Sequence, residues 1–160
     1  MNKYQLKITP YELSIRPYFS YMPKIRLFVI LFIVVFGSLI FFHNLLDADI
    51  IRIVIAVGVV LLFYIIYDYL FHVNVRFLFD KRTRSVYKVN IVKKRLMAFD
   101  EMTILTNSEY GDITYIMGKK KNQFVKNYTI SDTFGTSKKH QAREKEYIEQ
   151  ILHPILEFVK

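Results

Sequence analysis

The residue types that support catalysis or metal binding are few in this chain and widely spaced. There is no cysteine, and hence no cysteine nucleophile or thiolate ligand. His140 with Glu144, and Glu149 with His153, form i, i+4 pairs, but each pair supplies at most two ligands, fewer than a zinc site uses. No metal site is therefore expected. The four histidines are His43, His72, His140 and His153.

Other catalytic patterns are also missing. Asp100 and Glu101 are adjacent on a predicted strand, so their side chains point to opposite faces. Ser131 followed by Asp132 is typical of a turn cap, and nothing beside Ser131 would activate it as a nucleophile. The five glycines are not grouped, which excludes a glycine-rich phosphate loop. We expect a non-enzymatic protein with no catalytic residues and no cofactor.

Two long apolar runs dominate the first half of the chain. No Asp, Glu, Lys or Arg occurs from Leu27 to Leu46 or from Ile53 to Tyr67. A bilayer core about 30 Å thick requires about 20 helical residues. The pattern predicts a transmembrane helical hairpin at 24–71, with helices at about 25–43 and 50–71 and an outer connector at 44–49. A buried hairpin in a soluble protein is the alternative; a cleaved signal peptide fits poorly because the first run is too long.

The distribution of charge predicts the orientation of this hairpin. The chain carries a net charge of +9, and both the segment before the first run and the segment after the second are basic. The connector contains Asp47 and Asp49 instead. Because Lys and Arg near membrane helices stay on the cytoplasmic side, we expect a multi-pass protein of the inner (cytoplasmic) membrane with both termini in the cytoplasm.

Polar and small residues within the hairpin predict two kinds of contact. Asp68 ends the second helix at the level where Lys24 and Arg26 begin the first, so an ion pair at the inner interface is expected. Gly37 and Gly58 each lie ten residues from that boundary, at about 15 Å. Small residues at matching depth let two helices approach, which predicts a packing contact between them.

The segments outside the hairpin alternate with the period of β-strands. Residues 1–20 predict a β-hairpin that joins a larger sheet, and 72–160 predict a β-meander followed by a helix. Val73, Val75, Phe77 and Phe79 share one face of the first strand after the hairpin. Further strands are expected around Tyr87–Ile91, Leu96–Thr106 (with a break at Asp100-Glu101 as an alternative to one continuous strand), Ile113–Met117 and Phe124–Ile130. Turns are expected at Asp80–Arg84, Lys93–Arg95, Asn107–Asp112 and Gly118–Asn122.

The C-terminal segment changes to a helical period. Apolar residues from Ile148 to Val159 follow the spacing of one helical face, which predicts an amphipathic helix over about 140–159. Pro154 cannot donate a backbone hydrogen bond, so a kink or restart is expected near Gln150.

The order of these elements resembles a known family layout. The stretch Tyr4–Pro10 resembles the opening strand, and Phe77–Asp80 followed by Val86-Tyr87 resembles the first strand pair, of small bacterial membrane proteins with a two-helix hairpin inserted near the start of a pleckstrin-homology (PH)-like domain. The resemblance implies an α+β membrane protein with about seven antiparallel strands closed by the C-terminal helix. A closed barrel remains an alternative.

Counting reversals along the predicted meander assigns its turns to two ends of the sheet. Two basic turns are expected to face the inner leaflet, and the turn with Glu109 and Asp112 to face away. Anionic lipid favours such an arrangement, since each Lys or Arg near the surface contributes about 1 kcal/mol. Turns that are merely solvated are the alternative. The basic residues are Lys93, Lys94, Arg95, Lys119, Lys120 and Lys121.

Three classes of function are compatible with this layout. The first is a membrane-anchored PH-like module that binds anionic lipid head groups, a protein partner or a second copy of itself. The second is an immunity protein that binds a membrane-active toxin through the hairpin and its connector. The third is a two-span β-barrel effector that senses a cyclic nucleotide. Nucleic acid is not an expected partner, because lipid phosphate explains the same positive charge.

Overall fold

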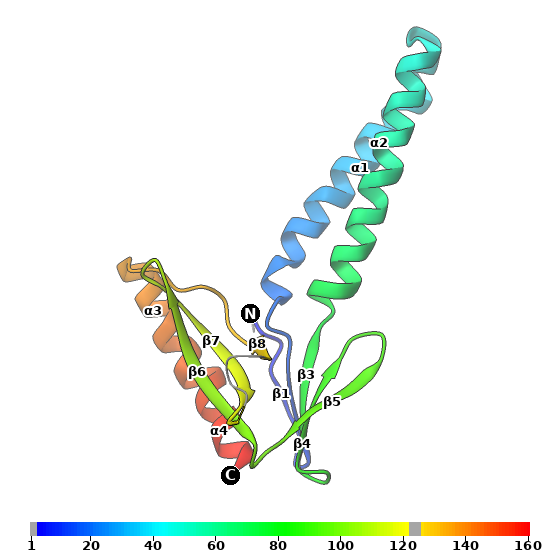
Figure 1. Ribbon diagram of the computed structural model, residues 1–160. Helices are drawn as coiled ribbons and strands as arrows, with labels where there is room; N and C mark the ends of the chain where they lie inside the picture. Colours follow the sequence, from blue (N-terminus) through cyan, green and yellow to red (C-terminus); the bar gives the residue numbers. More distant parts are fainter. Residues whose placement is uncertain (1–2, 122–125) are drawn as a thin grey trace.

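The computed structural model describes residues 3–121 and 126–160 (Figure 1). Two long apolar helices, two antiparallel sheets and a C-terminal helix make it an α+β protein, which confirms the predicted class. The described residues form eight strands where about seven were expected. The strands are β1 (Lys7–Ile8), β2 (Glu12–Ile15), β3 (Arg76–Asp80), β4 (Ser85–Val89), β5 (Lys93–Ala98), β6 (Met102–Glu109), β7 (Asp112–Lys119) and β8 (Asn127–Thr129).

The two apolar runs form a helical hairpin that projects away from the sheets (Figure 1). Its segments Phe19–Phe42 and Ala48–Val73 are long and apolar enough to cross a membrane. Only 6% and 11% of their most apolar stretches are buried, so neither is enclosed as the core helix of a soluble domain would be. The elements are η1 (Phe19–Tyr21), α1 (Met22–Phe42), η2 (His43–Leu45), α2 (Ala48–Asp68) and the π-helical turn η3 (Tyr69–Val73).

The hairpin emerges between two hydrogen-bonded strands of the five-stranded sheet, whose order is β1-β2-β3-β4-β5. Strand β2 pairs with β3 antiparallel, with Ile15 opposite Phe77. Because β2 leads into α1 and β3 follows α2, both legs of the hairpin begin at one end of this sheet. We call it the helix end, and we call the opposite end, at Asp80, the far end.

The alternation after the hairpin is confirmed from Val75 to Phe79, whereas Val73 ends η3 and packs with Ile25 and Ile65 of the helices. Val73, Val75, Phe77 and Phe79 are each 2% exposed or less. Side chains at every second position of a strand share one face, and burying each large apolar side chain contributes about 1.5–3 kcal/mol. This face of β3 anchors the base of α2 to the core.

The break expected at Asp100-Glu101 within Leu96–Thr106 is present, and it is a full reversal of the chain, which the assignment of turns to the two ends of the sheet did not include. Phe99 is buried, and its backbone N–H donates to the carbonyl of Arg84 at 2.9 Å. The chain then turns through Asp100 and Glu101, ends β5, and begins β6 in a second sheet of order β6-β7-β8. Burial of the Phe99 side chain holds this corner against the far end of the first sheet.

That additional reversal inverts the direction of every later strand. β6 runs back toward the helix end, where Tyr110 and Gly111, both with positive φ (51° and 86°), make a two-residue turn of the kind that tight hairpins use. β7 returns to the far end, where Lys120 N–H donates to the Glu101 carbonyl at 2.8 Å. Strand β8 begins at Asn127, and the first residues of the expected strand from Phe124 lie outside the described part of the chain.

The core lies between the two sheets and is completed by the C-terminal helix (Figure 1). Tyr147, Ile151, Ile155 and Phe158 of this helix pack into the same cluster as the buried strand residues. A π-helical turn just before Pro154 interrupts the helix, which confirms the predicted restart near Gln150. The elements are α3 (Lys138–Tyr147), the turn η4 (Ile148–Leu152) and α4 (His153–Val159).

Candidate functional site

The most connected polar group among the described residues is the carboxylate of Asp132, which lies between β8 and α3. Its side chain is only 12% exposed. It forms ion pairs with Lys3 and with Arg143 (3.1 Å), and it accepts a hydrogen bond from the Ser20 hydroxyl at 2.9 Å. The backbone N–H of Asp132 also donates to the Tyr4 hydroxyl at 3.3 Å. We call this set of five residues the Asp132 junction.

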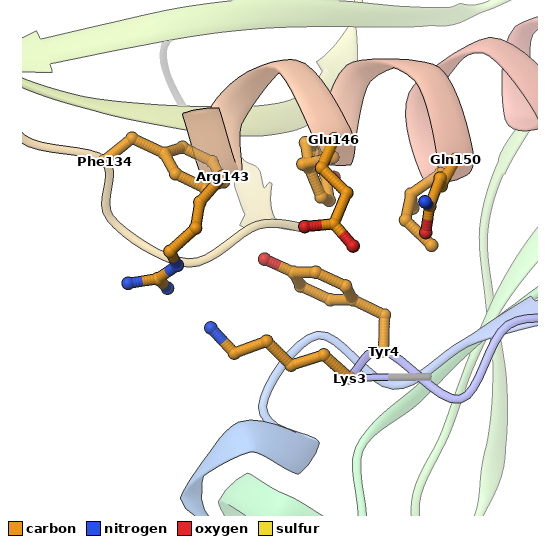
Figure 2. Close-up of a pocket in the computed structure, with 8 residues that line it drawn as sticks. Lys3, Tyr4, Phe134, Arg143, Glu146 and Gln150 are labelled. Carbon is orange, nitrogen blue, oxygen red and sulfur yellow. The ribbon is translucent and has the colours of Figure 1, made fainter. Parts of the chain in front are cut away.

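The junction joins segments that are far apart in the chain. Lys3 and Tyr4 precede β1, Ser20 lies in the turn that begins the helical hairpin, and Arg143 lies on α3. Figure 2 shows Lys3 and Arg143 pointing toward the same side of the Tyr4 ring. A single carboxylate therefore ties the N-terminus, the base of the hairpin and the C-terminal helix together.

Aromatic side chains continue the junction into the core. The ring of Tyr4 lies 4.9 Å from that of Tyr147, whose hydroxyl donates to the Ile130 carbonyl at 2.9 Å. Tyr115 donates to the Glu144 carboxylate, also at 2.9 Å. Burial raises the pKa of Tyr4 and Tyr147 well above the usual value, and burial with the Glu144 bond raises the pKa of Tyr115 to about 12. All three phenols are therefore neutral hydrogen-bonding groups at physiological pH.

A small pocket of about 80 Å³ lies beside the junction. This volume has room for a few water molecules and not for a nucleotide-sized ligand. Figure 2 shows Tyr4, Glu146 and Gln150 around it, between the N-terminal stretch and the C-terminal helix. The lining residues are Lys3, Tyr4, Phe134, Arg143, Glu146, Tyr147, Gln150 and Ile151.

Ser131, which precedes Asp132 in the chain, uses its hydroxyl in two contacts within the protein. Ser131 Oγ accepts from the Tyr115 backbone N–H at 2.8 Å and donates to the Asp132 carbonyl at 2.7 Å. Its hydroxyl proton is thus held by a carbonyl rather than by a base. Nor do the residues that the structure describes contain a group of three or more His, Asp or Glu placed to hold a metal ion. The arrangement can hold segments together and bind water.

The structure separates the two basic triplets that the sequence placed together. Lys93 and Lys94 lie at the helix end, although they begin strand β5 and the turn itself is formed by the three residues before them. Arg95, the third residue of the triplet, lies opposite Tyr87, midway along the sheet. Lys119, Lys120 and Lys121 lie at the far end, where Lys119 pairs with Glu101 at 3.0 Å. The second triplet was assigned to the wrong end because the count of reversals omitted the corner at Phe99.

The acidic turn also lies at the opposite end of the domain from the one predicted. The turn between Glu109 and Asp112 was expected to face away from the hairpin. Instead it points to the same side as the base of the hairpin, near the start of α3 (Figure 1). One missed corner accounts for this error as well.

The predicted ion pair at the base of the hairpin is not formed. Asp68 contacts His72 one turn further along, at 2.7 Å, and Lys24 lies over the Tyr21 ring, 5.0 Å from its centroid. The buried Ile25 occupies the seam between the helices, where it packs with Ile65 and Val73. Successive helical residues are about 100° apart, so Lys24 and Arg26 project to either side of that seam.

The two glycines of the hairpin have different surroundings. Gly58 is buried, and a Cβ built on it would overlap the ring of Phe36 on α1. A Cβ on Gly37 would meet nothing within 4 Å. Gly58 is therefore a close contact between the helices as predicted, and its partner is an aromatic ring rather than Gly37.

The roles of Asp132, Lys3 and Arg143 are not predictable from the sequence pattern. Their positions, 3, 132 and 143, carry no periodic or motif signal that links them. One local signal was available, since Asp132 lies between the buried residues Ile130 and Phe134, and a carboxylate flanked by core residues requires a partner.

His140 and Glu144, which are four residues apart on α3, do not contact each other but have separate partners. His140 Nδ1 accepts from the Gly135 backbone N–H at 2.9 Å, while Glu144 accepts from Tyr115. Both side chains thus stabilise the loop and core around α3.

Comparisons of the chain with protein-family models, with curated proteins and with solved structures gave no match.

Proposed function

We propose that this protein is a non-enzymatic module anchored in a membrane by its helical hairpin, with the β-domain held against an anionic leaflet. The observation that carries the proposal is the exposure of the hairpin. Leu27, Ile30, Phe41 and Phe63 are more than half exposed on helices that pack only against each other over most of their length. Monomeric soluble proteins rarely expose apolar patches of more than a few hundred Å².

A bilayer would remove this apolar surface from water. Transfer of apolar surface out of water contributes about 25 cal/mol per Å², and helices satisfy their own backbone hydrogen bonds within lipid.

The charges favour one orientation. Lys24 and Arg26 lie at the base of the hairpin, whereas its tip contains Asp47 and the mutual pair of Asp49 with Arg52 at 3.1 Å. Under the positive-inside rule the base, the sheets and both termini lie in the cytoplasm, at the inner leaflet. Anionic lipid head groups are then the nearest ligands for the exposed basic residues at the helix end.

We further propose that the β-domain is PH-like. Two antiparallel sheets enclosing one core with a C-terminal helix across it support that assignment. The division into five and three strands adds one short strand to the expected inventory. A protein partner could share the same module through the exposed edge of β1 or the turn at Tyr110.

Topology in cells tests the anchoring. Because the chain has no cysteine, Asn44→Cys and Lys160→Cys each give a single reactive thiol. In intact bacterial cells an impermeant maleimide should label the Asn44→Cys protein at the exposed tip and should label Lys160→Cys only after lysis. Labelling of Lys160→Cys from outside, or of neither variant before lysis with both behaving as soluble protein, would overturn the proposal.

A further inference from the structure

The turn between β4 and β5 exposes two adjacent apolar side chains. Ile91 is 65% exposed and Val92 is 73% exposed, at the tip of a hairpin in which Val89 pairs with Lys93. In the part of both sheets that the structure describes, no other two consecutive residues expose large apolar side chains. Solvation alone favours polar residues at a hairpin tip, so these two require another explanation.

Basic residues follow the apolar tip directly. Lys93, Lys94 and Arg95 are all exposed, and none of them forms an ion pair within residues 3–121 and 126–160. The Lys93 ammonium lies 4.3 Å from the centroid of the Tyr87 ring, on the side of Lys93 that faces away from the tip, and Lys94 follows on the opposite face of β5. The turn is thus apolar at its tip, and the first residues of the strand that follows it are cationic.

The position of the tip matches the base of the hairpin. Arg76, which begins β3 just after α2, pairs with Val89, and Val89 pairs with Lys93. The tip therefore projects from the helix end of the sheet, and Figure 1 shows this β4–β5 loop beside the base of α2. A membrane that ends at the base of the hairpin would meet the loop.

We propose that Ile91 and Val92 insert into the interfacial layer of the leaflet in which the hairpin ends, while Lys93 and Lys94 contact lipid phosphate. This inference rests on the anchoring proposed above and adds a second membrane contact to it. Apolar side chains gain by entering the boundary between head groups and acyl chains, and adjacent cations gain from anionic lipid. Together with the two legs of the hairpin, the tip fixes the sheet at one angle to the bilayer.

The absence of tryptophan allows a direct optical test with the full-length chain. Ile91→Trp places the probe at the tip. Thr83→Trp, in the exposed turn at the far end of the same sheet, is the matched control, and Val34→Trp, on the exposed face of α1, reports the anchor. Each variant is reconstituted in phosphatidylcholine–phosphatidylglycerol vesicles, with and without lipids brominated on the acyl chain.

The emission of the Ile91→Trp protein should shift to the blue relative to Thr83→Trp and should be quenched by shallow bromines. The Val34→Trp protein should be quenched by deep bromines. Adding Val92→Asp to Ile91→Trp should abolish the quenching at the tip, because a carboxylate does not enter the interfacial layer, and should leave the folded state intact at this exposed position.

Two results would overturn the inference, and they are distinguishable. If Val34→Trp is quenched while Ile91→Trp emits as Thr83→Trp does, the anchoring stands and insertion of the tip is wrong. If Val34→Trp is not quenched either, the hairpin does not cross the bilayer and both proposals fail.

Discussion

Asp132 contacts four residues that come from three distant segments of the chain. Replacing it would therefore remove contacts to the N-terminus, to the base of the hairpin and to the C-terminal helix. Lys3 and Arg143 both direct their charges at the carboxylate, the Ser20 hydroxyl donates to it, and the Asp132 backbone N–H donates to the Tyr4 hydroxyl. Removing one partner of a shielded ion pair leaves the others without compensation, which costs more than the pair itself contributes. The junction therefore holds the base of the hairpin to the C-terminal helix.

We predict that Asp132→Asn, which keeps the shape and removes the charge, lowers the free energy of unfolding by about 2–4 kcal/mol. The measurement is denaturant unfolding of the full chain in detergent micelles. Asp100→Asn, at an exposed turn, is the control and should change stability by less than about 0.5 kcal/mol. Equal stability of the two variants would contradict the role assigned to Asp132.

The buried tyrosines predict a loss of stability at alkaline pH. Burial raises the pKa of Tyr147 in the folded state, so above pH of about 10 the unfolded chain loses a proton that the folded chain retains. Stability from this group is complete below that pH and falls as the pH rises, by about 1.4 kcal/mol per pH unit. Tyr4 and Tyr115 act in the same direction.

Tyr147→Phe should accordingly reduce the slope of unfolding free energy against pH by about 1.4 kcal/mol per unit above pH of about 10. At neutral pH it should cost about 1 kcal/mol, through the lost bond to Ile130. Denaturant titrations at a series of alkaline pH values give both quantities. A variant with the wild-type slope would show that Tyr147 ionises in the folded state.

At the scale of elements, the contact between α1 and α2 depends on the absence of a side chain at Gly58. The Phe36 ring, stacked on Phe32 at 4.4 Å between centroids, fills the space where a Cβ would stand. Close approach at a small residue is how helices associate where water supplies no driving force. Gly37, by contrast, makes no such close contact with the other helix.

Gly58→Leu should therefore weaken the hairpin by about 1–3 kcal/mol, the usual cost of overpacking, whereas Gly37→Leu should be nearly neutral. Unfolding in mixed SDS micelles, followed by the helical circular dichroism signal, measures the difference. A larger loss for Gly37→Leu than for Gly58→Leu would show that the helices pack through the other face.

At the scale of the whole molecule, the two basic triplets act at opposite ends. Lys93 and Lys94 lie at the end of the sheet beside the base of the hairpin, and Arg95 follows them along β5. Lys119–Lys121 lie at the far end near Asp100 and Glu101. The Lys119 hydrogen bond holds the pKa of the Glu101 carboxyl below its usual value. The far end is therefore partly neutralised by its own acids and remote from the proposed membrane surface.

Replacing Lys93, Lys94 and Arg95 by Gln should weaken the contact of the tip with anionic lipid by about 3 kcal/mol, at about 1 kcal/mol per charge. Replacing Lys119, Lys120 and Lys121 by Gln should have no effect. Both triple variants are made in the Ile91→Trp background, and bromolipid quenching is followed against salt concentration in anionic vesicles. Equal losses in the two variants would indicate nonspecific attraction rather than a defined lipid-facing end.

Local periodicity was enough to predict much of the fold. The lengths of the two apolar runs, the alternation from Val75 to Phe79 and the helical spacing from Ile148 to Val159 each predicted an element that the structure contains. These signals lie within single segments, because a strand or a helix buries a face whose residues recur at a fixed spacing. Pro154 likewise predicted the restart of the helix through backbone chemistry that acts over one turn.

Tertiary structure alone decided which elements meet. The direction of each strand depends on every earlier reversal, so the corner at Phe99, held by a bond to Arg84 across the sheet, moved Lys119 to the far end. Asp132 has its partners because folding brings positions 3, 20 and 143 together. Lys24 does not pair with Asp68 because Ile25, not Lys24, faces the second helix. Local sequence records which face of an element is apolar, whereas the neighbours of a polar side chain are set by how the chain closes on itself.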